Sequence, residues 1–225
     1  GSGETVRFTA PSGHTTELVH AMEQIGNALP LHNPPPEPQG LSGMHPPRLD
    51  HVFLMCEDVD ETTRFYTEVL GFERHGMLGR ETLDMVGGTK MYFYQGHPDA
   101  HHDIALVQSK GDVEAPEPWG GFFPDGKVGI NHFAVGYPTR EEWLARIKHI
   151  TEKGVKFVIR GNHGMTHSAY ISDPDGNGIE VLYELPKEIW EDDINGALNY
   201  FEMMPTEGAD SLVDDTNYHQ FVAAK

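Results

Sequence analysis

The chain has 225 residues, 38% hydrophobic and 23% charged, an ordinary globular composition with room for one large or two small domains. Its 35 acidic residues outnumber its 16 basic residues. A surface of that charge repels nucleic-acid phosphates and anionic lipid, so neither nucleic acid nor a membrane is expected as a partner. The single cysteine, Cys56, cannot form an internal disulfide, which favours a reducing, cytoplasmic location.

A partial copy of a unit that recurs later opens the chain. Residues 9–18 match residues 172–181 in the spacing Pro-x-Gly-x-x-x-Glu. This spacing predicts a tight turn that leads into the last strand of a module. We therefore predict that residues 1–29 are the tail end of an earlier module whose start is missing. The proline-rich stretch 30–47 predicts a linker.

The first complete unit is predicted over residues 48–110. It begins with a short apolar strand at residues 49–54, which carries His51. An amphipathic helix follows from about residue 60 to residue 70 and ends at Gly71. Three further strand-like runs complete the unit, at residues 72–77, 90–94 and 103–108.

An insertion, residues 111–125, separates this unit from the next. It contains three large aromatic residues, Trp119, Phe122 and Phe123. Together with residues 85–94 they are candidates for the wall of a substrate pocket. The alternative is that the insertion forms a contact between two copies of the chain.

Residues 128–186 repeat the first unit. The opening strand, residues 130–135, carries His132 at the place that His51 has in the first copy. A helix is predicted from about Thr139, its N-cap, to about residue 153. The remaining strand-like runs are residues 156–160, 169–172 and 178–183. The unit β-α-β-β-β is thus used twice, which predicts an α+β fold of paired modules.

The last part of the chain is predicted to be simpler. Residues 187 to about 201 have the pattern of a terminal helix, and a polar tail continues to residue 225.

Comparison of equivalent positions in the two copies of the repeat singles out three residues. His51 and His132 lie on equivalent first strands, which should meet if the two modules pack side by side. Glu180 lies on the last strand of the second module. Two imidazoles and one carboxylate form the facial triad that leaves coordination positions open on a non-haem iron(II). Each residue alone has a simpler interpretation, a hydrogen-bonded residue of the core.

Several stretches resemble one known family: residues 49–77, residues 130–135, and the strings His101-His102-Asp103-Ile104-Ala105-Leu106 and His163-Gly164-Met165-Thr166, followed by Tyr170 and the turn Asp173-Pro174-Asp175-Gly176-Asn177. With them the chain resembles the vicinal oxygen chelate superfamily. Within it, the chain is similar to the type I extradiol dioxygenases of the catechol 2,3-dioxygenase kind, mainly their catalytic C-terminal domain. Residues 6–14 resemble the end of that family's non-catalytic N-terminal domain.

The resemblance implies the glyoxalase/bleomycin-resistance/extradiol dioxygenase fold, with residues 48–186 as the catalytic domain of paired βαβββ modules. It implies meta cleavage of a catechol, a step of aromatic hydrocarbon catabolism, with insertion of both atoms of O2 at iron(II). Manganese(II) suits the same ligands. The implied partners are a catecholic small molecule and O2, and we expect the protein to form a homo-oligomer.

The resemblance also assigns roles to single residues. His51, His132 and Glu180 match the metal ligands, and His102 matches an acid/base. His163 and Tyr170 match residues that hydrogen-bond the substrate hydroxyl oxygens. The remaining candidates have weaker cases: His167 competes with His163, His101 is expected to be a polar residue at a strand edge, and Glu17 is expected to be structural.

Two alternatives remain open. In glyoxalases and epimerases of the same fold, the metal has a fourth protein ligand on the last strand of the first module. Aligning residues 178–182 with residues 103–107 puts Ala105 at that place, and alanine has no donor atom. The other alternative is a metal-free module that binds a small molecule, which would have no need for the matched histidines and glutamate.

Overall fold

The computed structural model describes residues 4–11, 13–20, 43–44, 48–79, 83, 90–96, 100–108, 128–204, 206 and 221. The predicted insertion, residues 111–125, most of the predicted linker and most of the predicted tail lie outside these ranges. Within them, no helix is both long enough and apolar enough to cross a membrane.

The first half of the domain follows the predicted order of elements. β3 (Arg48–Cys56) leads into α1 (Val59–Arg64), which continues as a π-helical turn (Phe65–Val69). Asp58 caps α1, because its side chain accepts hydrogen bonds from the backbone N–H groups of Asp60 and Glu61. Gly71, at a φ of 77°, ends the helical segment as expected. Three strands follow: β4 (Glu73–Met77), β5 (Met91–Gln95) and β6 (Ile104–Gln108).

The second half repeats this order. β7 (Gly129–Tyr137) leads into α3 (Arg140–Glu152), whose N-cap is Thr139, as predicted. Three strands follow: β8 (Ile159–Asn162), β9 (Thr166–Ser172) and β10 (Gly178–Glu184). β8 begins three residues later than predicted, because Val155 and Lys156 are exposed after the helix and burial begins only near Ile159.

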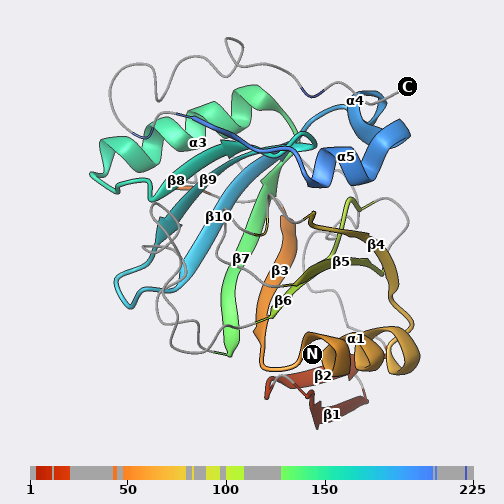
Figure 1. Ribbon diagram of the computed structural model, residues 1–225. Helices are drawn as coiled ribbons and strands as arrows, with labels where there is room; N and C mark the ends of the chain where they lie inside the picture. Colours follow the sequence, from red (N-terminus) through yellow and green to blue (C-terminus); the bar gives the residue numbers. More distant parts are fainter. Residues whose placement is uncertain are drawn as a thin grey trace.

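Within the described part of the chain, one nine-stranded sheet joins the two halves. Its order is β11-β8-β9-β10-β7-β3-β6-β5-β4, so each half lies on its own side of the central pair β3 and β7 (Figure 1). Counted outward from the centre, both halves have the same order: first strand, last strand, third strand, second strand. β3 and β7 pair antiparallel, which relates the halves by a pseudo-twofold. The predicted α+β fold of paired βαβββ modules is confirmed.

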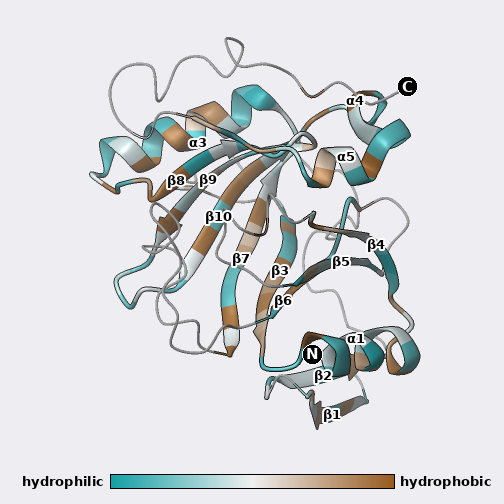
Figure 2. Cartoon of the chain, viewed as in Figure 1, coloured by the Kyte–Doolittle hydropathy of each residue, from teal (hydrophilic) through white to brown (hydrophobic). Residues whose placement is uncertain are grey.

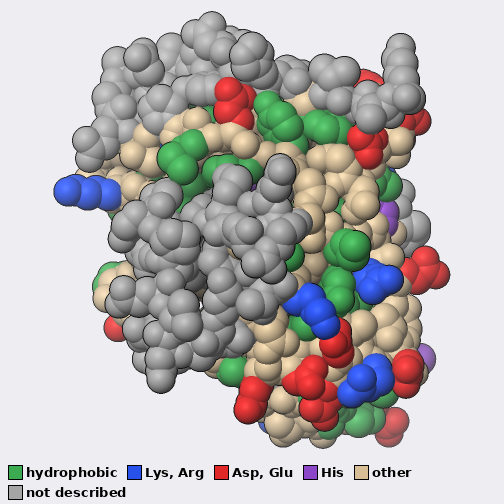
Figure 3. All heavy atoms as spheres, viewed as in Figure 1, with side chains coloured by type: hydrophobic (Ala, Val, Ile, Leu, Met, Phe, Trp, Pro, Cys, Tyr) green, Lys and Arg blue, Asp and Glu red, His purple; other side chains and the backbone are tan. Residues whose placement is uncertain are grey.

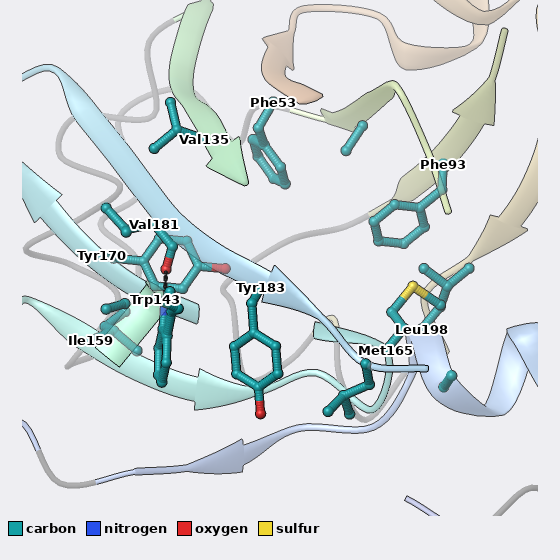
Figure 4. Close-up of a cluster of buried hydrophobic side chains, with 14 of the residues drawn as sticks. Phe53, Phe93, Val135, Trp143, Ile159, Met165, Tyr170, Val181, Tyr183 and Leu198 are labelled. Atoms are coloured by element: carbon teal, nitrogen blue, oxygen red, sulfur yellow. Dashed lines mark hydrogen bonds between the residues drawn. The ribbon is translucent and has the colours of Figure 1, made fainter. Parts of the chain in front are cut away.

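α3 covers the face of the sheet opposite to the one that carries the site. Trp143 of α3 donates its indole N–H to the carbonyl oxygen of Val181 on β10, at 2.9 Å (Figure 4). Its ring also lies 5.1 Å from that of Tyr183. Successive side chains of a strand point to opposite faces, so Glu180 and Leu182 point away from α3. In Figure 2 a hydrophilic section of β7 lies between hydrophobic sections of the same strand.

Charged side chains lie mainly outside this core. In the view of Figure 3, acidic and basic side chains lie side by side over the lower part of the molecule, where α1 lies. One pair there joins Lys90 to Asp60 of α1 at 2.6 Å. Because both side chains are about half exposed, we expect this pair to contribute little to stability.

The N-terminal segment forms a hairpin of β1 (Thr5–Thr9) and β2 (Thr15–Val19). The predicted turn is present, with Gly13 at a φ of 80°. Glu17 pairs with Arg7 on the neighbouring strand, which agrees with a structural role for this glutamate. That the hairpin ends an earlier module stays a prediction.

The predicted terminal helix is broken into shorter pieces: α4 (Lys187–Trp190), a 3-10 turn (Glu191–Asp193), α5 (Ile194–Leu198) and β11 (Glu202–Met203). The expectation of one helix was therefore wrong. Trp190 leaves the helical conformation, at a φ of −129°, and its indole donates to the carbonyl oxygen of Leu185. The side chain of Asp193 then caps a new helix by accepting from the N–H of Gly196.

Residues 194–203, called the C-terminal brace below, connect the two halves of the sheet. Asn199 donates a hydrogen bond to the carbonyl oxygen of Met77, the last residue of β4. It also accepts a hydrogen bond from the N–H of Gly79, two residues beyond the end of β4. At its other end the brace pairs β11 with β8. It leaves no room for a side chain at Gly161, where a Cβ atom would clash with the ring of Phe201. The brace therefore holds β4 at one side of the sheet and β8 at the other.

Candidate functional site

The two matched histidines face each other across the central strand pair. On each strand the preceding residue holds the Nδ1 atom: His51 Nδ1 lies 2.9 Å from Asp50 Oδ1, and His132 Nδ1 lies 2.6 Å from Asn131 Oδ1. Both partners are oxygen acceptors, so each Nδ1 carries a proton, and each Nε2 is the nitrogen left to bind a metal. Such partners are what orient imidazoles that bind a metal.

Glu180 completes the cluster from β10. Its Oε2 atom lies 3.0 Å from His51 Nε2 and 3.2 Å from His132 Nε2. The three side chains are 2–5% exposed, and their candidate ligand atoms all lie within 4.8 Å of one another. The structure thus brings together the three residues that the repeat singled out. Two neutral imidazoles and one carboxylate are a donor set that fits a divalent iron or manganese ion.

Electrostatics keep the carboxylate of this cluster charged. Burial alone raises the pKa of Glu180, but the positive charge of His51 and the hydrogen bonds from both histidines outweigh it and hold that pKa well below its usual range. Burial works in the opposite direction on His51, whose pKa the charge of Glu180 and the hydrogen bond to Asp50 raise to about 9. A metal cation that binds beside Glu180 would therefore displace a proton from His51 Nε2.

His102 lies against this cluster from the first half of the sheet. Its ring centroid is 4.2 Å from that of His51 and 4.9 Å from that of Phe93. Burial lowers the pKa of His102 well below its usual value, and the charge of His51 lowers it further. The side chain is therefore a neutral imidazole, which donates one hydrogen bond and accepts another.

The prediction for His101 was wrong. It does not lie at a strand edge but is 2% exposed, three residues before β6 begins. Its Nδ1 atom lies 2.7 Å from His102 Nδ1, and its Nε2 atom lies 3.1 Å from Asp50 Oδ1. The adjacent histidines in the sequence do not indicate that His101 is buried beside Asp50, because only folding brings these two residues together.

Tyr170 and His163 form a second polar group beside Glu180. Tyr170 is paired with Glu180 across β9 and β10, and its hydroxyl lies 2.8 Å from His163 Nε2. His163 stands on the tight turn between β8 and β9, which Gly164 permits at a φ of 77°. Burial raises the pKa of Tyr170 well above its usual value and lowers the pKa of His163 to about 4. Both groups are therefore neutral near pH 7.

His167 does not join this group. Its Nδ1 atom lies 3.2 Å from the hydroxyl of Tyr183, a residue whose ring packs against α3. The structure therefore brings His163, and not its competitor, beside Tyr170.

The strand register shows what stands opposite Glu180 in the first half. Phe53, two residues after His51, pairs with Ala105, and Ala134, two residues after His132, pairs with Glu180. Ala105 is thus the structural counterpart of Glu180, as the alignment of the repeat predicted. In the same way Phe93, paired with Ala105, is the counterpart of Tyr170. At these two positions the first half therefore has the apolar side chains of Ala105 and Phe93, and the second half has the carboxylate of Glu180 and the phenol of Tyr170.

The predicted pocket wall is described only in part. Phe93, from the predicted stretch 85–94, does contact His102. Residues 85–89 and the three aromatic residues of the insertion, Trp119, Phe122 and Phe123, lie outside the described residues. Sequence reasoning missed Phe53, whose ring stacks on His132 at 4.8 Å, and Asp50 and Asn131. The signal for the last two was present, since each directly precedes a histidine.

Known proteins resemble the chain over this domain. The profile of the Glyoxalase/Bleomycin resistance protein/Dioxygenase superfamily matches residues 48–181. A metapyrocatechase from Pseudomonas sp. (strain CF600) is 31% identical over 81% of this chain and 54% of its own length. A probable lactoylglutathione lyase from Vibrio parahaemolyticus is 29% identical over 60% of this chain and 89% of its own.

Among solved structures, the 2,3-dioxygenase LapB from Pseudomonas sp. KL28 superposes with a TM-score of 0.56 and 27% identity, over 81% of this chain and 58% of its own. The chain spans about half the length of the catechol dioxygenases that it matches in sequence.

Proposed function

The chain belongs to the glyoxalase/bleomycin resistance protein/dioxygenase superfamily, and we propose that within it the chain is an extradiol ring-cleavage dioxygenase. It would insert both atoms of O2 into a catecholic substrate. The observation that carries this proposal is the buried cluster of His51, His132 and Glu180, together with Ala105, which has no donor atom and is the counterpart of Glu180 among the described residues of the first half. The resemblance to the metapyrocatechase and to the 2,3-dioxygenase LapB supports it.

The proposed cofactor is iron(II), held by His51 Nε2, His132 Nε2 and the carboxylate of Glu180. When bound, an ion with three protein ligands supplies open positions where the two oxygens of a catechol and O2 can meet. Manganese(II) fits the same donors. Asp50 and Asn131 keep both imidazoles in the tautomer that this binding needs.

The surrounding side chains would handle the substrate. His102, a buried neutral imidazole, is the proposed acid/base. Tyr170 and His163 would hydrogen-bond the two hydroxyl oxygens, and a phenol that stays protonated is suited to donate. Phe53 and Phe93 lie beside the cluster and would contact the flat face or edge of an aromatic ring.

A panel of substituted catechols tests this function. The protein would be reconstituted with iron(II) without oxygen and then mixed with each catechol in aerated buffer. We expect O2 uptake and the yellow colour of a ring-opened semialdehyde for at least one catechol. Stoichiometric iron without O2 uptake for any catechol would contradict the proposal.

The match to lactoylglutathione lyases makes the fourth ligand position worth testing. Ala105→Glu would place a carboxylate at the counterpart of Glu180. We expect iron to bind at least as tightly, because an anionic donor is added to a divalent ion. Ring cleavage should fall by about 100-fold or more, because a carboxylate in the open position competes with catechol and O2. Metal content and turnover are the measurements.

Ala105 is fully buried, so the added volume needs its own control. Ala105→Leu adds a side chain of similar size without a donor, and it should lose stability without gaining affinity for iron. Normal turnover of the glutamate variant would show that this position does not face the metal.

The remaining expectations concern the whole protein. A homo-oligomer, a cytoplasmic location and a preceding non-catalytic module stay predictions.

A further inference from the structure

Four polar side chains form a connected chain that begins at the metal cluster and ends at His102. Asp50 is its centre: Oδ1 lies 2.9 Å from His51 Nδ1 and 3.1 Å from His101 Nε2, while Oδ2 accepts a hydrogen bond from Arg48 Nε at 2.9 Å. His101 then continues to His102 through two Nδ1 atoms 2.7 Å apart. The side chains of Asp50, His101 and His102 are all buried or nearly so.

The hydrogen bonds and the charge of Asp50 determine where each proton lies. Both oxygens of Asp50 face N–H donors, so this carboxylate acts as an acceptor. His101 Nε2 lies 3.1 Å from Oδ1 without making a hydrogen bond to it, and the negative charge of Asp50 favours a positive N–H over a lone pair at that distance, so Nε2 carries the proton. A neutral imidazole has one N–H, which leaves His101 Nδ1 as an acceptor.

The same logic then fixes His102. Two nitrogens 2.7 Å apart need one donor and one acceptor, and His101 Nδ1 is the acceptor. His102 Nδ1 therefore carries the proton of that ring, and its Nε2 keeps the lone pair.

We propose that His101 is a positioning residue that holds His102, through Asp50, in the tautomer whose Nε2 atom accepts a hydrogen bond from the substrate. This inference rests on the proposed function, because a catechol hydroxyl is the donor that His102 would meet. It explains why a second histidine is buried beside the first: a residue without an acceptor at the place of His101 Nδ1 would leave the ring of His102 free to turn or to exchange its N–H.

The tautomer can be measured without any turnover. ¹⁵N-histidine NMR on the metal-free protein and on the zinc-loaded protein, zinc being diamagnetic, distinguishes a protonated from an unprotonated ring nitrogen. We expect His102 to have a protonated Nδ1 and an unprotonated Nε2. The opposite assignment would overturn the proposal, whatever the activity.

Three variants of His101 test the consequence. His101→Asn places an amide oxygen near the position of Nδ1, His101→Gln reaches instead toward the position of Nε2, and His101→Phe keeps the bulk with neither. We expect iron content to be unchanged and kcat to fall about 10- to 100-fold for Phe and Gln, the range typical of lost partners around a metal site. The Asn variant should recover most of that loss, and KM should change less than kcat.

The outcomes separate this proposal from the proposed function. Equal kcat in all three variants and the wild type would overturn the role of His101 while leaving the dioxygenase intact. A wild type that cleaves no catechol would remove the proposed function, and the NMR assignment would then still decide the His101–His102 arrangement. If the Phe variant fails to fold, the Asn and Gln pair carries the comparison.

Discussion

Replacing His51, His132 or Glu180 by alanine is expected to abolish ring cleavage and to lower bound iron well below one ion per chain. Each of the three supplies one donor to the same point, since both imidazole Nε2 atoms lie about 3 Å from one oxygen of Glu180. A site with three protein ligands has no spare donor, so we expect a loss of metal affinity of more than about 100-fold. Metal analysis after gel filtration, together with turnover, measures both effects.

The matched control is His149→Ala, which removes a histidine in the last turn of α3. This variant should keep its iron and its activity. Full iron content in all three cluster variants would remove the ligand assignment, and with it the proposed reaction.

A change at His102 should separate metal binding from chemistry. His102→Phe is expected to keep iron and to bind catechol, because the proposed iron ligands are His51, His132 and Glu180, and His102 belongs instead to a second buried group with His51 and His101. Turnover should fall about 10²- to 10⁴-fold, the usual cost of losing a general acid/base. Anaerobic catechol titration and kcat are the two measurements.

Phenylalanine suits this test because His102 already packs edge-on against Phe93 and close to His51. An unchanged kcat would leave His102 with a packing role only. Loss of iron in this variant would mean instead that the ring supports His51, and the assignment as acid/base would have to be given up.

The internal repeat made most of the fold and the converging residues predictable. It located the two histidine strands and the last strand with Glu180, because equivalent residues of two packed copies must lie in equivalent places. It also placed Ala105 opposite Glu180, and the strand register agrees. Strand and helix ends were found within a few residues where a cap such as Thr139 marked them.

What the sequence could not predict depends on contacts between distant residues. The role of His101 needs Asp50 beside it, 51 residues earlier in the chain, and no local pattern encodes that. One continuous terminal helix was predicted, whereas burial of Trp190 and capping by Asp193 break it. In both cases tertiary packing decides between arrangements that the local sequence allows.

The C-terminal brace has a consequence for the order in which the protein folds. Its contacts with the first half join residues about as far apart as Gly79 and Asn199, separated by 120 positions. Closing a loop of that length costs more entropy than forming the hairpins of either half, so these contacts should form late. Phe201 of the brace packs against His163, 5.1 Å between ring centroids. A chain whose brace has opened could therefore keep its central strands and its metal ligands while losing the wall behind His163, so that substrate binding would be the first property to disappear on partial unfolding.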